Sequence, residues 1–513
     1  MVPGQQGVRL RYATLSHRWR HQSLLKTLLA NLEQHIRRIP YRSLGSTFAN
    51  AVKCARYLGL RYLWIDALCI IQDSTSDWDE QSAQMGDIYS NGVVNIVAAA
   101  AEQREDEHFL CKRPRYVVIP YCITMRKNLL KGHICFDTAP EEEAEPANWN
   151  PLLQRGWIVQ ERLLAPRTLT FGAKTLLWEC REAVFDEVDL LRPRGPRREV
   201  NFDGYTTQNQ NNTLASLLSY NHQSSGEAHR NACYKYWREA VAGYTKAELT
   251  FLSDRLIALG GIAGILAPSL GDEYIAGMWS GDIARSLLWM SFGRLESGPT
   301  WSWGSYSGQI RFPLDELRSS QISQLEEHVT LCNGKPELSG TNRFGHVHSG
   351  VLELNCIVHE VLYNAIRPGL YGYSYSVSPI HHEACYAQES PMDGICAIQT
   401  LSCDAGWLHG WRDRLRRIST EQTHRLPNGQ LLEDQANTSV FILPVMSWDD
   451  IVGYSPNQFG QNTKSGAGSV LACLLLIPFE HCIDTFQRLP ELFFVQIKDF
   501  EWKSYPRRNI KIV

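Results

Sequence analysis

The first 100 residues alternate between short apolar segments and amphipathic segments, and this alternation restricts the fold more than any other feature of the chain. Residues 11–16 are β-rich, residues 61–71 form a nearly continuous apolar run, and residues 92–101 are a third strand-like segment. Between them, residues 46–58 and 76–89 carry apolar side chains at helical spacing. This βαβαβ pattern predicts a mainly parallel sheet in which the three strands are neighbours and the two helices are crossovers.

Two local features refine this prediction. Gly59 follows the first helix at a position where a helix end favours positive φ. The apolar run from Arg61 to Ile71 resembles a strand that is covered on both faces, so we expect Trp64 and Leu68 to be buried.

The rest of the chain divides by composition and pattern. Residues 155–167 are helix-like and end near Pro166, and residues 169–179 resemble a hairpin. We expect helices at 236–266, in two pieces, and at 279–292, followed by short strands. The predicted organisation is an α/β domain followed by an α+β region, with boundaries at residues 1–185 (first domain), 186–231 (linker), 232–310 (helical region) and 311–513 (strand-rich region).

Charge and cysteine usage limit the classes of partner. The chain has 51 Lys and Arg against 54 Asp and Glu, a net charge of −3, so there is no excess of cations for binding nucleic acid. No apolar stretch has the length of a spanning helix, and the start of the chain lacks the apolar region of a secretory signal. The 14 cysteines form no CxxC pair and fit reduced thiols. We therefore expect a cytoplasmic protein with no nucleic-acid or membrane partner.

Polar residues at the ends of two predicted strands form the first candidate site. In an open parallel sheet, ligands bind beyond the carboxyl ends of the strands. This rule selects Ser16, His17, Arg18 and Trp19 after the first strand and Asp66 in the second segment. His17 could serve as an acid or base, and Arg18 could bind a phosphate. Alternatively, Ser16 and His17 form only a local turn, and Asp66 pairs with Arg61 or with that turn.

Other cofactor and metal motifs are absent from the sequence. It contains neither a GxGxxG fingerprint nor a GxxxxGK[ST] loop, so no dinucleotide or nucleotide cofactor is expected. A group of histidines and cysteines lies late in the chain, at His381, His382, Cys385, Cys396 and Cys403. Its spacing matches no standard zinc motif, so the sequence predicts no metal site.

Several segments together resemble the fungal heterokaryon incompatibility (HET) domain. They are YATLSHRW at 12–19, LGLRYLWIDALCIIQD at 58–73, MGDIYSN at 85–91 and RGWIVQERLLAPRTLTF at 155–171. LTFLSDRLIALGGIA at 249–263 and PTWSWGSYSG at 299–308 are similar to the region that often follows this domain. The resemblance identifies residues 1–185 as the HET domain and 232–310 as the associated region. Two positions depart from the family pattern: Arg20 replaces a usual glycine, and Gln81 replaces a frequent glutamate.

The resemblance implies a fold and a function. HET domains are considered distantly similar to TIR domains, so a TIR-like (flavodoxin-like) sheet is expected. The implied function is fungal non-self recognition, in which the domain triggers growth arrest or programmed cell death. Protein partners or self-association are expected for such a module.

The similarity to TIR domains also implies an enzymatic alternative, because some TIR domains cleave NAD and carry a catalytic glutamate in a similar Trp-x-x-x-Glu spacing. Here that spacing selects Trp157 and Glu161, with Glu161 as the central carboxylate assisted by His17 and Asp66. NAD would then be a substrate rather than a cofactor. Alternatively, Glu161 pairs with Arg155 or Arg162 in a structural role. The departures at Arg20 and Gln81 favour the non-enzymatic reading.

Overall fold

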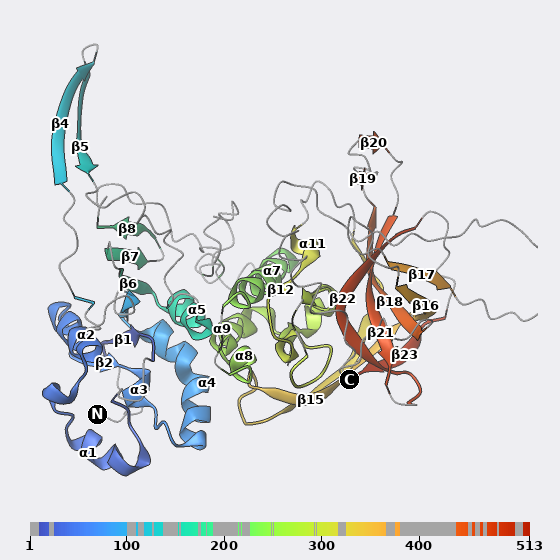
Figure 1. The fold of residues 1–513 in the computed structure, drawn as a ribbon, viewed down its shortest axis with the longest axis horizontal. Helices are drawn as coiled ribbons and strands as arrows, with labels where there is room; N and C mark the ends of the chain where they lie inside the picture. Colours follow the sequence, from blue (N-terminus) through green and yellow to red (C-terminus); the bar gives the residue numbers. More distant parts are fainter. Residues whose placement is uncertain are drawn as a thin grey trace, which may run out of the picture. The chain divides into compact units, whose positions relative to one another are not determined.

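A computed structural model of the chain shows two units (Figure 1). Unit 1 comprises Met1–Gly271 and Gly340–His346, and unit 2 comprises Asp272–Ser339 and Val347–Val513. The structure describes residues 10–19, 25–99, 109–110, 117–125, 128–136, 152, 155–172, 176–180, 182–187, 214, 217, 226–247, 249, 251–291, 293, 295–316, 325–365, 375–379, 438–449, 454–456, 462–464, 469–479, 482–497 and 506–513.

Unit 1 is built on a six-stranded, mainly parallel sheet with the order β2-β1-β3-β6-β7-β8. β1 is parallel to both β2 and β3, and β3 is parallel to β6. The prediction of three parallel neighbours is therefore confirmed, with the first strand between the other two. β7 is antiparallel to both β6 and β8, and the β6–β7 pair confirms the predicted hairpin. The strands are β1 (Tyr12–Ser16), β2 (Tyr62–Trp64), β3 (Val94–Val97), β6 (Arg167–Phe171), β7 (Leu176–Cys180) and β8 (Val184–Asp186).

The predicted crossover helices are present. The first, α2 (Ser46–Tyr57), is followed by Gly59 with a φ of +69°, as its position after the helix predicted. The second, α4 (Thr75–Asn91), begins after Ser74, whose side chain accepts a hydrogen bond from the backbone N–H of Asp77. The other elements of unit 1 are η1 (Leu29–Asn31), α1 (Leu32–Arg37), η2 (Tyr41–Ser43), α3 (Asp66–Cys69), β4 (Val117–Met125), β5 (Asn128–Phe136), α5 (Gly156–Leu164), α7 (Glu227–Tyr244), α8 (Asp254–Ile257) and α9 (Gly260–Leu270).

The apolar run at 61–71 is not one strand, so this prediction was wrong. β2 ends at Trp64, and α3 begins at Asp66, whose carboxylate accepts a hydrogen bond from the N–H of Ala67. Periodicity alone cannot separate a buried strand from a buried helical turn in such a run. Leu68 is buried as expected, whereas Trp64 is only half-buried because β2 is the edge strand of the sheet.

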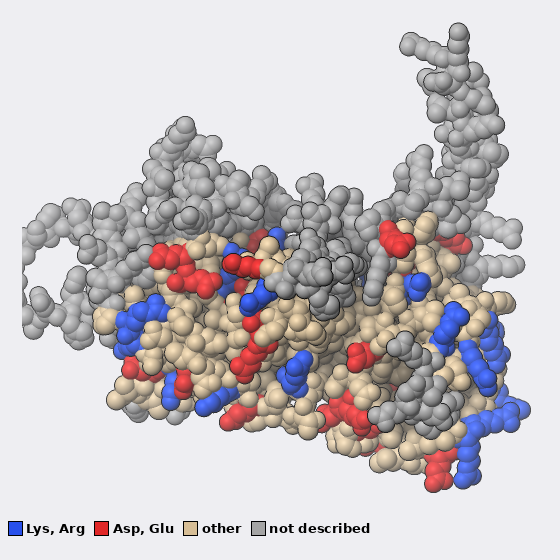
Figure 2. Space-filling view, turned by 180° about the vertical axis from the view of Figure 1, so that it is seen from behind, with Lys and Arg blue, Asp and Glu red and all other residues tan. Residues whose placement is uncertain are grey.

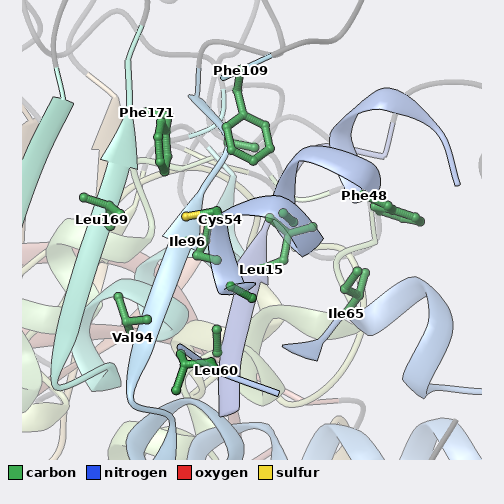
Figure 3. Close-up of a cluster of buried hydrophobic side chains, with 14 of the residues drawn as sticks. Leu15, Phe48, Cys54, Leu60, Ile65, Val94, Ile96, Phe109, Leu169 and Phe171 are labelled. Atoms are coloured by element: carbon green, nitrogen blue, oxygen red, sulfur yellow. The ribbon is translucent and has the colours of Figure 1, made fainter. Parts of the chain in front are cut away.

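Alternation along the central strands gives the sheet of unit 1 two different faces. Ala13 and Leu15 of β1, together with Val94 and Ile96 of β3, belong to a buried apolar cluster. α2 contributes Phe48 and further side chains to the same cluster (Figure 3). Because successive strand residues point to opposite faces, the intervening residues of β1 and β3 face away from this core.

The helices α4, α5 and α9 pack against one another in unit 1. α4 and α9 meet at two glycines: a Cβ added to Gly86 would lie 2.6 Å from the Cα of Gly261. The side-chain oxygen of Gln160 in α5 accepts a hydrogen bond of 2.7 Å from the N–H of Gly261. The predicted helical segment at 236–266 starts earlier, at Glu227, and has three pieces rather than two, namely α7, α8 and α9.

Unit 2 is strand-rich, as predicted for the end of the chain. Its nine-stranded sheet has the order β14-β15-β23-β22-β21-β18-β16-β17, with β13 paired to β18. Its elements are β9 (Tyr274–Ile275), β10 (Met278–Trp279), η7 (Ser280–Asp282), α10 (Ile283–Ser286), β11 (Met290–Ser291), η8 (Trp303–Ser305), β12 (Ile310–Arg311), α11 (Pro313–Glu316), β13 (Glu326–Glu327), β14 (Thr330–Leu338), β15 (Val347–Cys356), β16 (His359–Ala365), β17 (Tyr375–Pro379), β18 (Thr438–Asp449), β19 (Tyr454–Pro456), β20 (Asn462–Lys464), β21 (Ser469–Pro478), β22 (Thr485–Ile497) and β23 (Arg508–Ile512).

The predicted amphipathic helix at 279–292 is wrong. Among its described residues, 279–291, only Ile283–Ser286 is α-helical, and the short strands β10 and β11 lie at the two ends of this stretch. Trp279 and Trp289, which lie near the two ends of this segment, are fully buried together with Leu287 and Leu288. The polar residues Asp282, Ser286 and Ser291 are buried as well, so the segment has no solvent-exposed polar face of the kind that an amphipathic helix presents.

Candidate functional site

A polar network lies on the face of the unit 1 sheet opposite the apolar cluster. Thr14 of β1 donates to the side-chain oxygen of Asn95 in β3 at 3.0 Å, and the Ser16 oxygen lies 3.1 Å from the same atom. The Asn95 amide nitrogen lies 2.9 Å from the Ser16 oxygen. All three side chains are buried, and their hydrogen bonds satisfy groups that would otherwise be costly to bury.

Glu161 joins this network from α5. The Ser16 hydroxyl donates a hydrogen bond to Oε2 of Glu161, and the hydroxyl of Tyr89 in α4 is a further hydrogen-bonding partner of Glu161. Glu161 is 8% exposed. The carboxyl group is therefore enclosed by one strand and two helices that lie far apart in the sequence.

The surroundings of Glu161 raise its pKa. Burial raises the pKa of the carboxyl group from 4.5 to about 7, and the negative charge of Asp66 acts in the same direction. The hydrogen bonds from Ser16 and Tyr89 and the positive charge of Arg155 lower the pKa and only partly offset burial. Near neutral pH the group therefore exists in both its protonated and its ionised form, as an acid–base group requires.

A second cluster surrounds Asp66, at the first turn of α3. Oδ1 of Asp66 lies 3.6 Å from Nδ1 of His17, and the indole N–H of Trp19 donates to Oδ2 at 2.8 Å. The His17 ring is buried and meets the ring of Phe48 edge-on, with 5.1 Å between the centroids. The Asp66 carboxylate therefore contacts two residues of the segment that follows β1. This segment is the turn with which the sequence analysis expected Asp66 to pair.

The two clusters meet at the carboxyl ends of β1 and β2. Ser16 and His17 are consecutive residues, and the guanidinium of Arg155 donates a hydrogen bond of 2.8 Å to the backbone oxygen of His17. Asp66 and Arg155 both affect the pKa of Glu161 through their charges. The structure therefore brings Ser16, His17, Asp66 and Glu161 together at the sheet edge that the sequence indicated.

Other predicted residues lie elsewhere. Of the two arginines considered as partners of Glu161, Arg162 instead forms an ion pair of 2.6 Å with Glu179 of β7, whereas Arg155 belongs to the site and acts on Glu161 through its charge. The indole N–H of Trp157 donates to Asp254 at 3.1 Å, and its ring packs edge-on against Trp78. Trp157 thus joins α5 to α4 and α8. Arg18 is exposed beside the site.

Sequence reasoning missed Tyr89 and Asn95 as members of this site, and it named Arg155 only as a possible structural partner of Glu161. Tyr89 was assigned only to the apolar face of its helix. Asn95 carried a signal, because it is a polar residue within the apolar strand sequence VNIV. The role of Arg155 depends on a contact with a residue 138 positions earlier, which no local pattern reports.

The chemistry available at this edge is that of carboxyl, imidazole and hydroxyl groups. A buried carboxyl with a pKa of about 7 can exchange a proton or stabilise a positive charge. Within the part of the chain that the structure describes, no group of three His, Cys, Asp or Glu side chains could hold a metal ion. The late histidines and cysteines from His381 to Cys403 and the departure at Arg20 lie outside the described residues.

Comparison with known proteins gives one match. No curated protein and no solved structure matches the chain. Among the described residues, no helix combines the length and apolarity needed to cross a membrane. Residues 12–161 match the family described as Heterokaryon incompatibility protein (HET), a stretch that begins with β1 and ends at Glu161. This match suggests a role in heterokaryon incompatibility. The chain is a HET domain-containing protein.

Proposed function

We propose that this chain is a fungal non-self recognition protein whose HET domain triggers growth arrest or programmed cell death in the cytoplasm. The observation that carries the proposal is the family match over residues 12–161, which contains every member of the polar network around Ser16 and Glu161. Self-association or a protein partner would supply the signal that starts the response.

A TIR-like architecture of the first unit is part of the proposal. Its parallel strands have the order β2-β1-β3-β6, and a sheet that starts 2-1-3 and continues with the next parallel strand is the flavodoxin-like order. In such sheets the functional site lies beyond the carboxyl ends of the central strands. This edge is where Ser16 and Glu161 meet.

Cleavage of NAD is the second candidate function, and the setting of Glu161 favours it. In that reaction the bond between the ribose C1′ and the nicotinamide nitrogen breaks, nicotinamide leaves with the bonding electrons, and water adds to C1′. Positive charge develops on the ribose, and an ionised Glu161 would stabilise it. Arg155, Ser16 and Tyr89 favour the ionised form, and His17 beside Asp66 could hold a proton or orient the ribose.

Expression of the full chain in yeast tests both functions together, with viability and cellular NAD followed at equal protein level. The variants are Glu161→Gln, which keeps the shape and removes the charge, and Glu80→Gln as a matched control on the exposed side of α4. Growth arrest by wild type and by Glu80→Gln supports the recognition function. A soluble wild-type chain that leaves growth unchanged contradicts it.

The NAD measurement separates the two candidates. If the protein cleaves NAD, wild type depletes it, and Glu161→Gln slows the loss by about 10²–10³-fold, the usual effect of removing one stabilising group. Growth arrest at constant NAD with both wild type and Glu161→Gln would reject NAD cleavage and leave the signalling function.

A further inference from the structure

We propose that the outer face of α2, with the adjoining η2, docks this protein onto an anionic lipid surface. The face is defined by Tyr41, Arg42, Lys53, Arg56 and Tyr57, all of which are exposed, and it is called the α2 basic face below. The proposal concerns docking onto the surface of a bilayer, so it replaces the expectation, drawn from the net charge and the lack of a spanning segment, that the protein has no membrane partner. It adds a site to the proposed function without depending on it.

Charge is strongly segregated in this part of the chain. Between residues 34 and 65 the sequence has six Lys and Arg and no Asp or Glu, although the chain as a whole has a net charge of −3. Lys and Arg side chains gather over the part of unit 1 where Figure 1 places α1 and α2 (Figure 2). Such a group of cations attracts the negative headgroups of a cytoplasmic membrane leaflet.

Tyr41 joins the two elements of this face, η2 and α2. Lys53, Arg56 and Tyr57 are three and four residues apart and therefore neighbours on the helix. The Tyr41 hydroxyl donates to the backbone oxygen of Ala49 at 3.3 Å, and the guanidinium carbon of Arg56 lies 5.9 Å from the centre of the Tyr41 ring. η2 is thus held against the outer face of α2, whose opposite face belongs to the buried core.

Exposed apolar side chains stand among these cations. Tyr57 is 89% exposed, and the next residue, Leu58, is 42% exposed. A tyrosine ring flanked by Lys and Arg suits the boundary between headgroups and acyl chains, where the ring enters the apolar layer and the cations meet phosphate.

These observations favour lipid over nucleic acid, the other polyanion. The Tyr41 ring has Arg56 above it and its hydroxyl bonded to Ala49, so it is poorly placed for stacking on a base. A phosphate backbone would bury no apolar surface of Leu58, whereas insertion into a bilayer would remove that surface from water.

The experiment is flotation of the purified full chain with two kinds of vesicle, phosphatidylcholine alone and phosphatidylcholine with about one third phosphatidylserine. We expect binding to the anionic vesicles only, and weaker binding as salt rises. Neutralising Arg42, Lys53 and Arg56 together to Gln should weaken binding by about a hundredfold, because each cation near an anionic surface contributes about fivefold. Tyr57→Ser leaves the charge unchanged and should still weaken binding by about tenfold through lost apolar burial.

A matched triple variant controls for net charge. Arg167, Lys335 and Arg343 are exposed cations outside the α2 basic face, and changing all three to Gln alters the charge equally. We expect this control to bind like wild type. The proposal is overturned if wild type does not float with anionic vesicles, if the control triple loses as much binding, or if binding to duplex DNA or RNA replaces binding to vesicles.

Discussion

Gly86 of α4 and Gly261 of α9 face each other so closely that a Cβ on either residue would lie 2.6 Å from the Cα of the other. Two helices can approach this closely only where neither carries a side chain. The contact fixes α9 against α4, and Gln160 of α5 supports it by accepting the N–H of Gly261. Gly86 lies in the family segment MGDIYSN, and its partner lies 175 residues later in LGGIA.

Gly86→Ala and Gly261→Ala should therefore destabilise unit 1. The added methyl group would contact backbone, which cannot move aside as a flexible side chain can, so we expect a loss of about 1–3 kcal/mol for each variant. The measurement is the midpoint of thermal or denaturant unfolding. Gly264→Ala is the control in the same helix, because its Cβ would lie 3.6 Å from Phe344 in ordinary contact. Equal effects of all three substitutions would show that helix propensity, rather than close approach, decides stability here.

Removing one partner of the ion pair between Arg162 and Glu179 should lower the free energy of unfolding far more than removing one partner of an exposed pair. The side chain of Glu179 is 2% exposed, and Arg162 binds it through two hydrogen bonds of 3.0 Å and 2.6 Å. Arg162→Met would leave a buried carboxylate without this cation, at a cost of about 3–5 kcal/mol. Arg37→Met removes the exposed partner of Glu33 and should change unfolding by less than about 1 kcal/mol. Similar unfolding midpoints for Arg162→Met and Arg37→Met would contradict the greater importance of the buried ion pair.

Much of the sheet could be predicted from the sequence, because its elements follow local rules. Alternation, helical spacing and Gly59 predicted β1, β3, α2 and α4. The prediction failed at 61–71, where an almost continuous apolar run carries no periodic signal, and at 279–292, where polar residues such as Asp282 and Ser286 are buried together with the apolar ones.

The site was predictable only in part, because several of its contacts join residues that lie far apart in the sequence. The strand-end rule selected Ser16, His17 and Asp66, and the family resemblance selected Glu161. No local pattern predicts that Ser16 donates to a carboxylate 145 residues away, or that Tyr89 of another helix joins them. Such contacts depend on how α4 and α5 pack on the sheet, which is a property of the whole unit.

The raised pKa of Glu161 predicts a specific dependence of stability on pH. Between pH 4.5 and about 7 the folded chain holds a proton on Glu161 that the unfolded chain has released. The stabilisation from this proton is complete below pH 4.5 and is lost as the pH rises through 7, with a total of about 3 kcal/mol. Glu161→Gln has no such proton, so it should gain stability relative to wild type as the pH rises through this window. Parallel pH profiles of the unfolding midpoint for the two proteins would contradict a raised pKa.

Ser16→Ala should move that window upward. The Ser16 hydroxyl donates to the carboxylate and lowers the pKa of Glu161, so its removal raises the pKa above 7 and extends the protonated form to higher pH. The measurement is the difference in unfolding midpoint between Ser16→Ala and the double variant Ser16→Ala/Glu161→Gln, followed against pH. Thr14→Val is the matched control, because Thr14 bonds Asn95 on the same face and has no hydrogen bond to Glu161 among those the structure describes. We expect the control to keep the wild-type window. A window that stays in place in Ser16→Ala would mean that burial alone sets the pKa of Glu161 and that the hydroxyl serves only to join β1 to β3.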